Sequence, residues 1–476
     1  MFRRETYINR RKALSASVSS GLIILLGNEE MPMNYKDNTY HFRQDSSFLY
    51  YFGLDQPTLA GIVDADSGES VLFGDDVTVE MIVWTGTLPT IAHLCEQVGI
   101  SNSKPYPEFS KAIEKAISQN REIHFLPPYR LANTILLSNL LDVPLKKVNE
   151  LASLQLVKAV IAQREIKSEE EIKEIEKAVD ISADMHLAAM RFTRPGMRES
   201  EVAAKVAEVA QAKNGNISFP IIATINGQTL NNHHHGNTIK SGDLFLLDAG
   251  AETEMRYAGD LSSTFPVDPV FTSRQKVIYQ LCLDAHNASI LMLKPGTPFR
   301  EAHFEACRII FDGLKSLGLT KGNTEEALLA GAHALFFPCG TGHMLGLDAH
   351  DMEDLGEQWV GYDGVPKSTQ FGLKSLRLGK PLQPGYVVTI EPGIYFIPEL
   401  IDMWKAEGKH EAFLNFPEIE KYKDFGGLRN EEDLLITKDG YRRLGKSLPI
   451  TIEGVEAVRQ GDVNGLDLGI RQEGLI

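Results

Sequence analysis

Four carboxylates in the C-terminal half of the chain lie beside strand-like apolar segments. Asp248 follows the run FLL, and Glu391 follows VVTI. Asp260 lies in YAGDLSSTFPV, and Glu431 lies in GLRNEEDLLIT. A single Asp or Glu in such a place is usually a cap, a turn or a surface residue. An ionised carboxylate beside a buried strand is costly unless it is paired or bound to a metal, so four of them together predict a metal site.

One histidine completes this set. His343 lies in GTGHMLGLDAHD (340–351), where the neighbouring glycines let the backbone approach whatever the imidazole contacts. A lone histidine is usually a satisfied core residue, but this glycine-rich setting favours a ligand. Four carboxylates and one imidazole suit Mn²⁺, or Co²⁺, Fe²⁺ or Zn²⁺, better than an ion selected by thiolates. Their four negative charges call for two divalent cations, which can activate water, so the set predicts a hydrolase.

An internal repeat indicates how the carboxylates are brought together. Arg194-Pro195-Gly196 and Lys294-Pro295-Gly296 each end one helix and precede another. The segments GDLFLLDAG (242–250) and GYVVTIEPG (385–393) both start with glycine and carry a carboxylate six residues later. Pro-Gly after a helix is a common stop, but two matched features in the same order favour a duplication. Two such halves, folded face to face, would bring their carboxylates together.

The first part of the chain has a different pattern. Short apolar segments at 21–27, 59–66 and 70–74 predict strands, and 107–119 has helical spacing. Ser168 and Glu171 form a capping box, after which Ile172, Ile175 and Val179 form the apolar stripe of a long helix. We therefore predict an α/β (α+β) protein, with a small N-terminal α/β domain at 1–160 and a pseudo-twofold domain at 161–476.

Composition narrows the class of protein. With 48 basic and 64 acidic side chains, the formal charge is −16, which argues against binding to nucleic acid or to an anionic membrane surface. No apolar segment approaches the length of a membrane span, and the basic start lacks a signal-peptide cleavage site. The cysteines are too few and too scattered for a disulfide framework; they are Cys95, Cys282, Cys307 and Cys339. We expect a cytoplasmic protein.

At these residues the chain resembles the aminopeptidase P and prolidase family, proline-specific metallopeptidases with the pita-bread fold. The metal ligands of that family correspond in order to Asp248, Asp260, His343, Glu391 and Glu431. The segment HFRQDSSFLYYFGLDQPTLAGIV (41–63) is similar to part of the N-terminal domain of aminopeptidase P. The resemblance implies two metal ions, with Mn²⁺ as the expected ion, and a bridging hydroxide.

The resemblance also implies roles beyond the ligands. Glu391 would act as general base, His350 would contact the substrate carbonyl or the tetrahedral intermediate, and Arg429 would pair with site carboxylates and substrate. Two positions depart from the family pattern. Asn231 stands where the family has a histidine, so His233, or else His234 or His235, would replace it. Cys339 stands where the family often has another histidine.

The leading hypothesis is an Xaa-Pro aminopeptidase, whose partner is a peptide with proline in second position. An Xaa-Pro dipeptidase (prolidase) is the close alternative, since the 40-residue interval between Glu391 and Glu431 is more typical of that enzyme. A catalytically inactive pita-bread binding protein, or a metal-free creatinase-like hydrolase, fits less well because all five ligands are present. The family resemblance also makes a homodimer a reasonable expectation.

Overall fold

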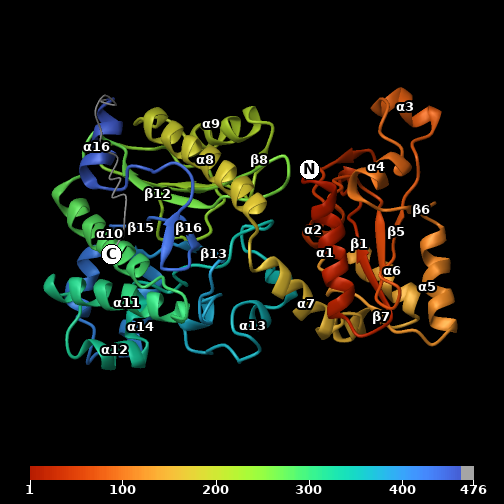
Figure 1. The fold of residues 1–476 in the computed structure, drawn as a ribbon. Coiled ribbons are helices and arrows are strands. Elements are labelled where there is room, and N and C mark those ends of the chain that lie inside the picture. Colours follow the sequence, from red (N-terminus) through yellow and green to blue (C-terminus); the bar gives the residue numbers. More distant parts are fainter. Residues whose placement is uncertain (462–476) are drawn as a thin grey trace. The chain divides into compact units, whose positions relative to one another are not determined.

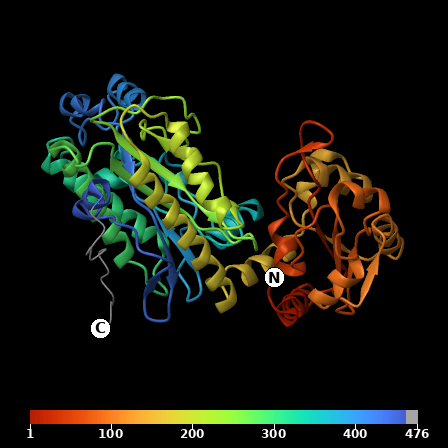
Figure 2. The same ribbon diagram turned by 90° about the horizontal axis from the view of Figure 1, so that it is seen from above.

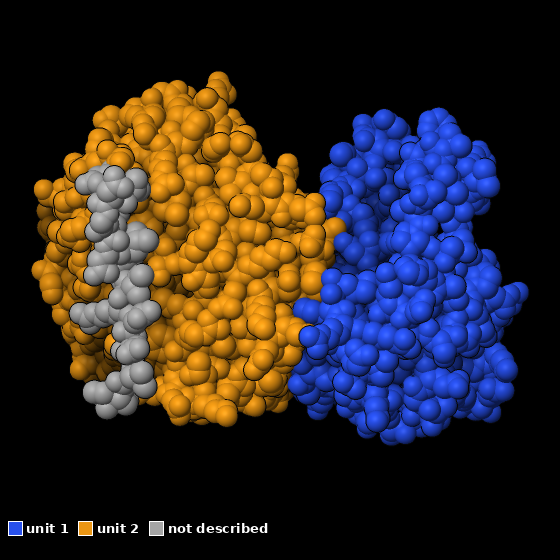
Figure 3. Space-filling view, turned by 45° about the horizontal axis from the view of Figure 1, so that its top comes forward, with its two compact units in different colours: residues 1–164, 352–359 blue, residues 165–351, 360–476 orange. Residues whose placement is uncertain are grey.

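The structure, a computed structural model, describes residues 1–461 of the chain. The chain divides into two compact units (Figure 3). One consists of Met1–Arg164 with Met352–Trp359, and the other consists of Glu165–Asp351 with residues 360–461. Within residues 1–461, no helix has both the length and the apolar character that crossing a bilayer requires.

The first unit is built on a five-stranded mixed sheet with the strand order β6-β5-β4-β1-β7 (Figure 1). Its strands are β1 Leu22–Leu26, β2 Pro32–Tyr35, β3 Asn38–Thr39, β4 Ala60–Asp64, β5 Ser70–Phe73, β6 Asn102–Lys104 and β7 Ile123–His124. Its helices are α1 Arg4–Ser17, α2 Ser46–Phe52, α3 Val79–Thr85, α4 Ile91–Val98, α5 Glu108–Ser118, α6 Leu131–Leu141 and α7 Leu154–Arg164, with short 3₁₀ turns η1 Leu145–Lys147 and η2 Asn149–Leu151.

The predictions for this unit are confirmed. The three expected strands are β1, β4 and β5, and the expected helix is α5. Strand β1 is antiparallel to β4 and parallel to β7, and its side chains Leu22 and Ile24 pack into the core of the unit. Continuous burial along β1 explains why its sequence is an apolar run and not an alternating pattern.

The second unit contains two three-stranded sheets, ordered β12-β10-β9 and β13-β16-β17, and several short strand pairs. Its strands are β8 Asn216–Ile217, β9 Ile222–Thr224, β10 Leu244–Ala249, β11 Ala251–Glu252, β12 Leu261–Pro266, β13 Val387–Ile390, β14 Gly393–Tyr395, β15 Gly427–Arg429, β16 Glu432–Ile436 and β17 Tyr441–Arg443. Its longer helices are α8 Glu169–Phe192, α9 Glu199–Ala212, α10 Ser273–Leu291, α11 Phe299–Ser316, α12 Thr324–Ala330, α14 Pro398–Ala406 and α16 Ile452–Gln460. Its shorter helical elements are η3 Ala332–Leu335, η5 Leu373–Ser375, α15 Phe416–Ile419 and η6 Glu420–Tyr422. Two further short elements, η4 Glu353–Leu355 and α13 Glu357–Val360, lie in the segment that belongs to the first unit, except for Val360 at the end of α13.

Helix α8 begins at the predicted capping box. The Ser168 side chain accepts a hydrogen bond from the Glu171 N–H, and the Glu171 carboxylate accepts one from the Ser168 N–H at 3.0 Å. Ile175 and Val179 are fully buried, whereas Ile172 is only partly buried. Helices α8 and α9 lie side by side, and α8 packs on β10 and β12 (Figure 2). The predicted helix is therefore confirmed, and it covers the first of the two sheets.

The two halves of this unit repeat in their hydrogen bonds. Gly196 follows α8 and donates its N–H to the Ile239 carbonyl at 2.8 Å. Gly296 follows α10 and donates its N–H to the Leu382 carbonyl, also at 2.8 Å. Both glycines have positive φ, so glycine suits the turn that follows each helix. Side chains from both halves contribute to one hydrophobic core.

Candidate metal centre

Glu391 and Glu431 lie in matching gaps between strands. Glu391 is between β13 and β14, and Glu431 is between β15 and β16. Because β13 pairs with β16 and β14 pairs with β15, both gaps are at the same level of the sheet. Pro392 has no N–H to donate, which accounts for the interruption after β13. Glu391 directly follows its strand, as the sequence predicted, whereas Glu431 lies at a break in its strand-like segment. At both positions the side chain leaves the regular ladder.

Asp248 and Asp260 come from the other half. Asp248 lies in β10 opposite Ser262 of β12, and Asp260 immediately precedes β12. The chain between them is not a tight hairpin turn, because β11 leaves it to pair with β8. The antiparallel pairing of β10 with β12 brings both aspartates to the end of the pair.

His343 joins the carboxylates of the two halves. Its Nε2 lies 3.5 Å from Asp260 Oδ2 and 3.6 Å from Glu391 Oε1. Ligand atoms of Asp260, His343 and Glu431 all lie within 4.8 Å of one another. The Nδ1 of His343 is 3.0 Å from the Met344 carbonyl oxygen, to which it donates. This bond leaves the Nε2 lone pair directed at the carboxylates, as a metal ligand requires.

Arg429 connects Asp248 to the same group. Its guanidinium donates to Asp248 Oδ2 at 2.5 Å, to the Tyr395 hydroxyl at 2.7 Å and to Ser262 Oγ at 3.0 Å. Its Nε also lies 4.0 Å from Glu391 Oε2. The arginine is buried, so each of these directions is fixed by packing as well as by hydrogen bonds. The planar guanidinium of an arginine can donate to several acceptors in fixed directions at once, whereas the ammonium of a lysine could not replace it here.

Burial and mutual repulsion disfavour the charged form of these acids. Burial, with the Asp248 charge second, raises the pKa of Asp260 to about 8. Burial is also the largest cause that raises the pKa of Glu391 and of Glu431, and neighbouring carboxylates add to it. Arg429 supplies only one positive charge. A buried, oxygen-rich set with excess negative charge and one imidazole fits divalent metal ions, which would compensate the charge and keep the acids ionised.

The remaining predicted residues lie at different distances from this centre. The exposed ring of His350 is 4.3 Å from the ring of His343, centroid to centroid. Cys339 is partly buried, with its Sγ 4.0 Å from the Tyr395 hydroxyl. His233 is exposed, and its ring makes no hydrogen bond to any residue within 1–461. His235 donates from Nε2 to the Ile221 carbonyl oxygen, 3.0 Å away. The structure thus brings His350 to the centre but leaves His233 in an exposed segment.

Three residues near the ligands were missed in the sequence. Ser262 donates to Glu431 Oε2 at 2.8 Å, and Tyr395 receives the Arg429 bond. Asp433 Oδ2 accepts from the Asp260 N–H at 3.0 Å, and burial raises the pKa of its carboxyl. Asp433 follows Glu431 by two residues, so strand alternation could have placed it on the same side; no sequence signal pointed to Ser262 or Tyr395.

Two family profiles match the chain. Residues 173–438 match "Metallopeptidase family M24", and residues 7–124 match "Aminopeptidase P, N-terminal domain". Together they confirm the predicted fold class, an N-terminal α/β domain followed by a pita-bread domain.

Individual proteins show the same similarity. The Homo sapiens Xaa-Pro dipeptidase is 30% identical over 468 residues, which cover 96% of this chain and 92% of that protein. A probable Xaa-Pro aminopeptidase of Aspergillus niger is 30% identical over 460 residues, covering 95% and 91%. The solved structure of a Pseudomonas aeruginosa aminopeptidase matches with a TM-score of 0.81 at 26% identity, covering 97% of this chain and 99% of that one. A structure of Escherichia coli aminopeptidase P in complex with substrate matches with a TM-score of 0.79 at 27% identity and the same coverage.

Proposed function

Because the chain belongs to metallopeptidase family M24, we propose that it is an Xaa-Pro aminopeptidase, which hydrolyses the bond between an N-terminal residue and a following proline. The observation that carries this proposal is the complete set of acidic and imidazole side chains that meets between β10, β12, β13 and β16. The aminopeptidase P type of N-terminal domain and the aminopeptidase P structures that match nearly the whole chain support the same substrate class.

We assign Asp248, Asp260, His343, Glu391 and Glu431 as the ligands of two divalent cations. When bound, such ions supply Lewis acidity, which polarises the scissile carbonyl and makes water acidic enough to attack at neutral pH. Their charge would also replace the protons that the metal-free acids hold. Mn²⁺ is the proposed ion, because carboxylates outnumber the single imidazole and no thiolate takes part.

Glu391 is the proposed general base. Its side chain is 20% exposed, the most open of the acids in contact with His343, so it can reach water as well as the substrate. Burial raises the pKa of its carboxyl in the metal-free site. A general base must lie within reach of the proton that it accepts, and the partial exposure of Glu391 meets this requirement. Removing the carboxylate would therefore affect proton transfer more than peptide binding.

We propose separate roles for His350 and Arg429 beside Glu391. The exposed ring of His350 stands beside His343, where it can donate to the carbonyl oxygen of a bound peptide. Arg429 is a positioning residue, since its donors hold Asp248 and Tyr395 in place.

His233 is proposed to contact the peptide from the exposed segment before β10. Separate alanine variants of His233, His234 and His235 would identify the histidine that contacts the peptide. We expect His233→Ala to raise KM for peptides and the other two variants to leave KM unchanged. Equal behaviour of all three would contradict the assignment.

Chelation followed by metal addition tests the reaction itself. We expect the metal-free protein to be inactive on an Xaa-Pro-Xaa tripeptide and Mn²⁺ to restore turnover as about two equivalents bind. Glu431→Ala should remain folded and inactive at any Mn²⁺ concentration. Unchanged activity after chelation would contradict a metal-dependent mechanism, and inactivity of the Mn²⁺-loaded protein would favour the binding-protein alternative.

Prolidase activity is the second candidate, favoured by the relatives that are Xaa-Pro dipeptidases and match 96% of the chain. The comparison of an Xaa-Pro dipeptide with an Xaa-Pro-Xaa tripeptide separates the two. Higher kcat/KM on the tripeptide supports an aminopeptidase, whereas turnover restricted to the dipeptide replaces our first choice with the second.

A cytoplasmic location and a homodimer remain predictions. Fractionation of cells and sedimentation of the purified protein would test them directly.

A further inference from the structure

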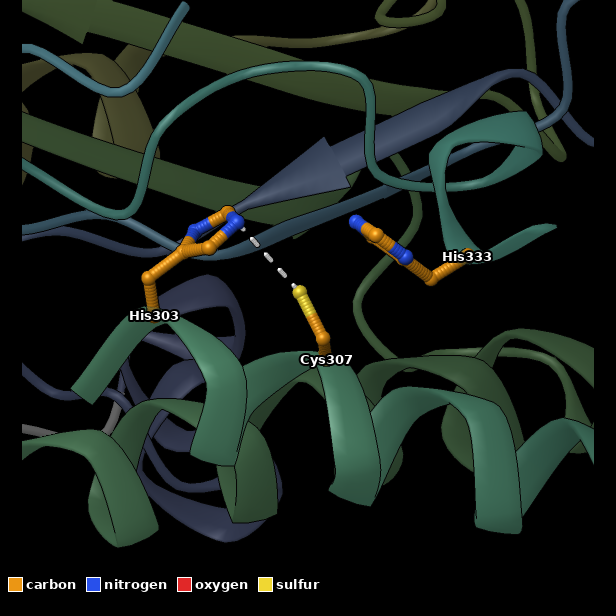
Figure 4. A group of neighbouring side chains, drawn as sticks. All are labelled: His303, Cys307 and His333. Carbon is orange, nitrogen blue, oxygen red and sulfur yellow. Dashed lines mark hydrogen bonds between the residues drawn. The ribbon is translucent and has the colours of Figure 1, made fainter. Parts of the chain in front are cut away.

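A second group of potential metal ligands lies in the hydrophobic core of the second unit. His303 and Cys307 are one helical turn apart on α11, and His333 comes from the 3₁₀ turn η3 (Figure 4). The three side chains point toward one another across the space between these two elements (Figure 4). None of them belongs to the carboxylate centre, and the proposed reaction uses none of them.

All three side chains are cut off from solvent, and His333 lacks the hydrogen bonds that such burial demands. His303, Cys307 and His333 are 0%, 0% and 1% exposed. Neither ring nitrogen of His333 has a hydrogen-bond partner within the described residues. Buried polar atoms in folded proteins are almost always satisfied, so an imidazole with two orphan nitrogens requires an explanation. A bound cation would account for one of the two nitrogens.

The distances suit coordination. One ligand atom from each residue lies within 4.8 Å of the others, and Cys307 Sγ is 3.5 Å from His303 Nε2. With ligand distances of about 2.3 Å for sulfur and 2.1 Å for nitrogen, tetrahedral coordination separates the two atoms by about 3.6 Å. A small rotation of the His333 ring would bring one of its nitrogens to a similar distance from the other two ligand atoms.

The tautomer of His303 is set by a neighbour. Its Nδ1 is 2.8 Å from Thr341 Oγ1. With the proton on Nδ1 and directed at this oxygen, the Nε2 lone pair faces Cys307, which is the usual arrangement for a metal-ligating histidine. Burial lowers the pKa of His303 to about 3 and of His333 to about 4, so both rings are neutral at physiological pH.

We propose that His303, Cys307 and His333 bind one thiophilic cation, Zn²⁺ or Cu⁺, at a site distinct from the carboxylate centre. One thiolate and two imidazoles are soft to borderline donors, unlike the carboxylates that would select Mn²⁺. A thiolate with Cu⁺ is neutral, and a thiolate with Zn²⁺ and one hydroxide is neutral as well. Either arrangement avoids leaving a net charge in an apolar core.

The ion would act as a structural link. It would tie α11 to η3, and the chain leaves η3 directly for the segment that carries Thr341 and the ligand His343. The His303–Thr341 bond already joins α11 to that segment. Coordination would therefore steady the position of His343 without contacting the substrate.

Co²⁺ supplied during expression tests the Zn²⁺ form, because it enters as the chain folds. A thiolate bound to Co²⁺ gives a near-ultraviolet charge-transfer absorption that carboxylates and imidazoles cannot produce. We expect this band in the wild-type chain, with one cobalt equivalent retained in the Glu431→Ala variant. Cys307→Ala should abolish the band, and Cys339→Ser, which alters a cysteine beside the Tyr395 hydroxyl, should keep it.

A parallel measurement covers Cu⁺. Protein produced with copper should retain one Cu⁺ against a competing chelator, and Cys307→Ala should lose it. If a Cys307 variant fails to fold, as judged by circular dichroism, His333→Leu keeps the thiol and should weaken retention of either ion at least tenfold. The proposal is overturned if the wild-type chain shows neither the band nor retained Cu⁺, or if the band persists in Cys307→Ala.

Discussion

The ion pair between Lys167 and Asp351 offers a sharp test of how the loop beside the metal centre is held. Lys167 Nζ lies 2.7 Å from Asp351 Oδ2, and each side chain is only 1% exposed. The Lys167 N–H also donates to the Gly385 carbonyl at 2.9 Å, close to the start of β13. Asp351 accepts from the Asp348 N–H at 3.4 Å, inside the turn that follows His343. Lys167 therefore connects the strand that leads to Glu391 with the loop that carries His350.

Replacing Lys167 by Met keeps most of the side-chain volume but removes the ammonium. The Asp351 carboxylate then stays buried without this cation, which costs about 3–5 kcal/mol for a buried pair. The double variant Lys167→Met/Asp351→Asn removes the charge as well and retains an acceptor for the Asp348 N–H. We expect it to recover more than half of the lost stability.

Tryptophan fluorescence can report this loss in the correct unit. Trp404 is buried in the second unit, whereas Trp84 and Trp359 belong to the first. In a Trp84→Phe/Trp359→Phe background, urea unfolding followed through Trp404 would give the four free energies of a double-mutant cycle. All four proteins should be compared at one saturating Mn²⁺ concentration, because bound metal stabilises the folded state.

The magnitude of the coupling energy decides the outcome. A coupling below about 1 kcal/mol is what exposed ion pairs give, and it would refute the idea that burial makes this pair structurally important. Activity provides a second readout. Since His350 directly precedes Asp351, Lys167→Met should lower kcat even where the protein is fully folded, and the double variant should restore part of it.

Three further predictions concern the metal centre. Arg429→Lys keeps the charge but loses the fork that holds Asp248, so kcat/KM should fall about 10–100-fold at saturating metal; an unchanged value would show that charge alone suffices. Glu391→Gln should lower kcat about 100–10,000-fold if proton transfer limits the rate, and single-turnover kinetics would separate this effect from weaker binding. In the metal-free protein the pKa of Asp260 is raised to about 8 from the usual value of 3.8 for this side chain, so the folded state holds a proton that the unfolded state releases. Its stability should therefore decrease as pH rises from about 4 to about 8, and thermal unfolding of the chelated protein should show this slope while the metal-loaded protein should not.

Much of the fold was readable because local signals agreed with it. The apolar runs became β1, β4 and β5, and the capping box began α8 where expected. These features depend on residues near one another in the chain, so a single sequence contains them.

The parts that could not be predicted depend on contacts between distant segments. Ser262 and Tyr395 look like ordinary strand residues, yet they fix Arg429 and Glu431 through bonds that span more than thirty residues. The exposure of His233 likewise follows from how its segment packs and not from its own triplet of histidines. Sequence spacing identified the candidate ligands, whereas only the structure revealed what orients them.

The hydrogen bonds between the two halves extend the repeat beyond its sequence signature. Asp248 lies opposite Ser262 in the β10–β12 pair, and the register of β13 with β16 places Glu391 opposite Glu431. Ser262 and Glu431 are thus equivalent positions, and they bond to each other at 2.8 Å.

A second equivalent pair of contacts crosses between the same strands. The Asp260 N–H donates to the Asp433 side chain at 3.0 Å, and the Arg429 N–H donates to the Thr264 side chain at 3.1 Å. One half supplies Asp248 and Asp260, and the other supplies Glu391 and Glu431. Within residues 1–461, neither half has basic side chains that pair with both of its own carboxylates, so neither could bury the two charges alone. The charge excess arises where the halves meet, which is why we place the proposed metal ions at that junction. The two halves differ in the residue that lies beside the equivalent strand position. Thr389 donates its N–H to the His343 carbonyl, whereas the equivalent Leu246 pairs with Thr224. At this position one half therefore has an imidazole and the other has a hydroxyl.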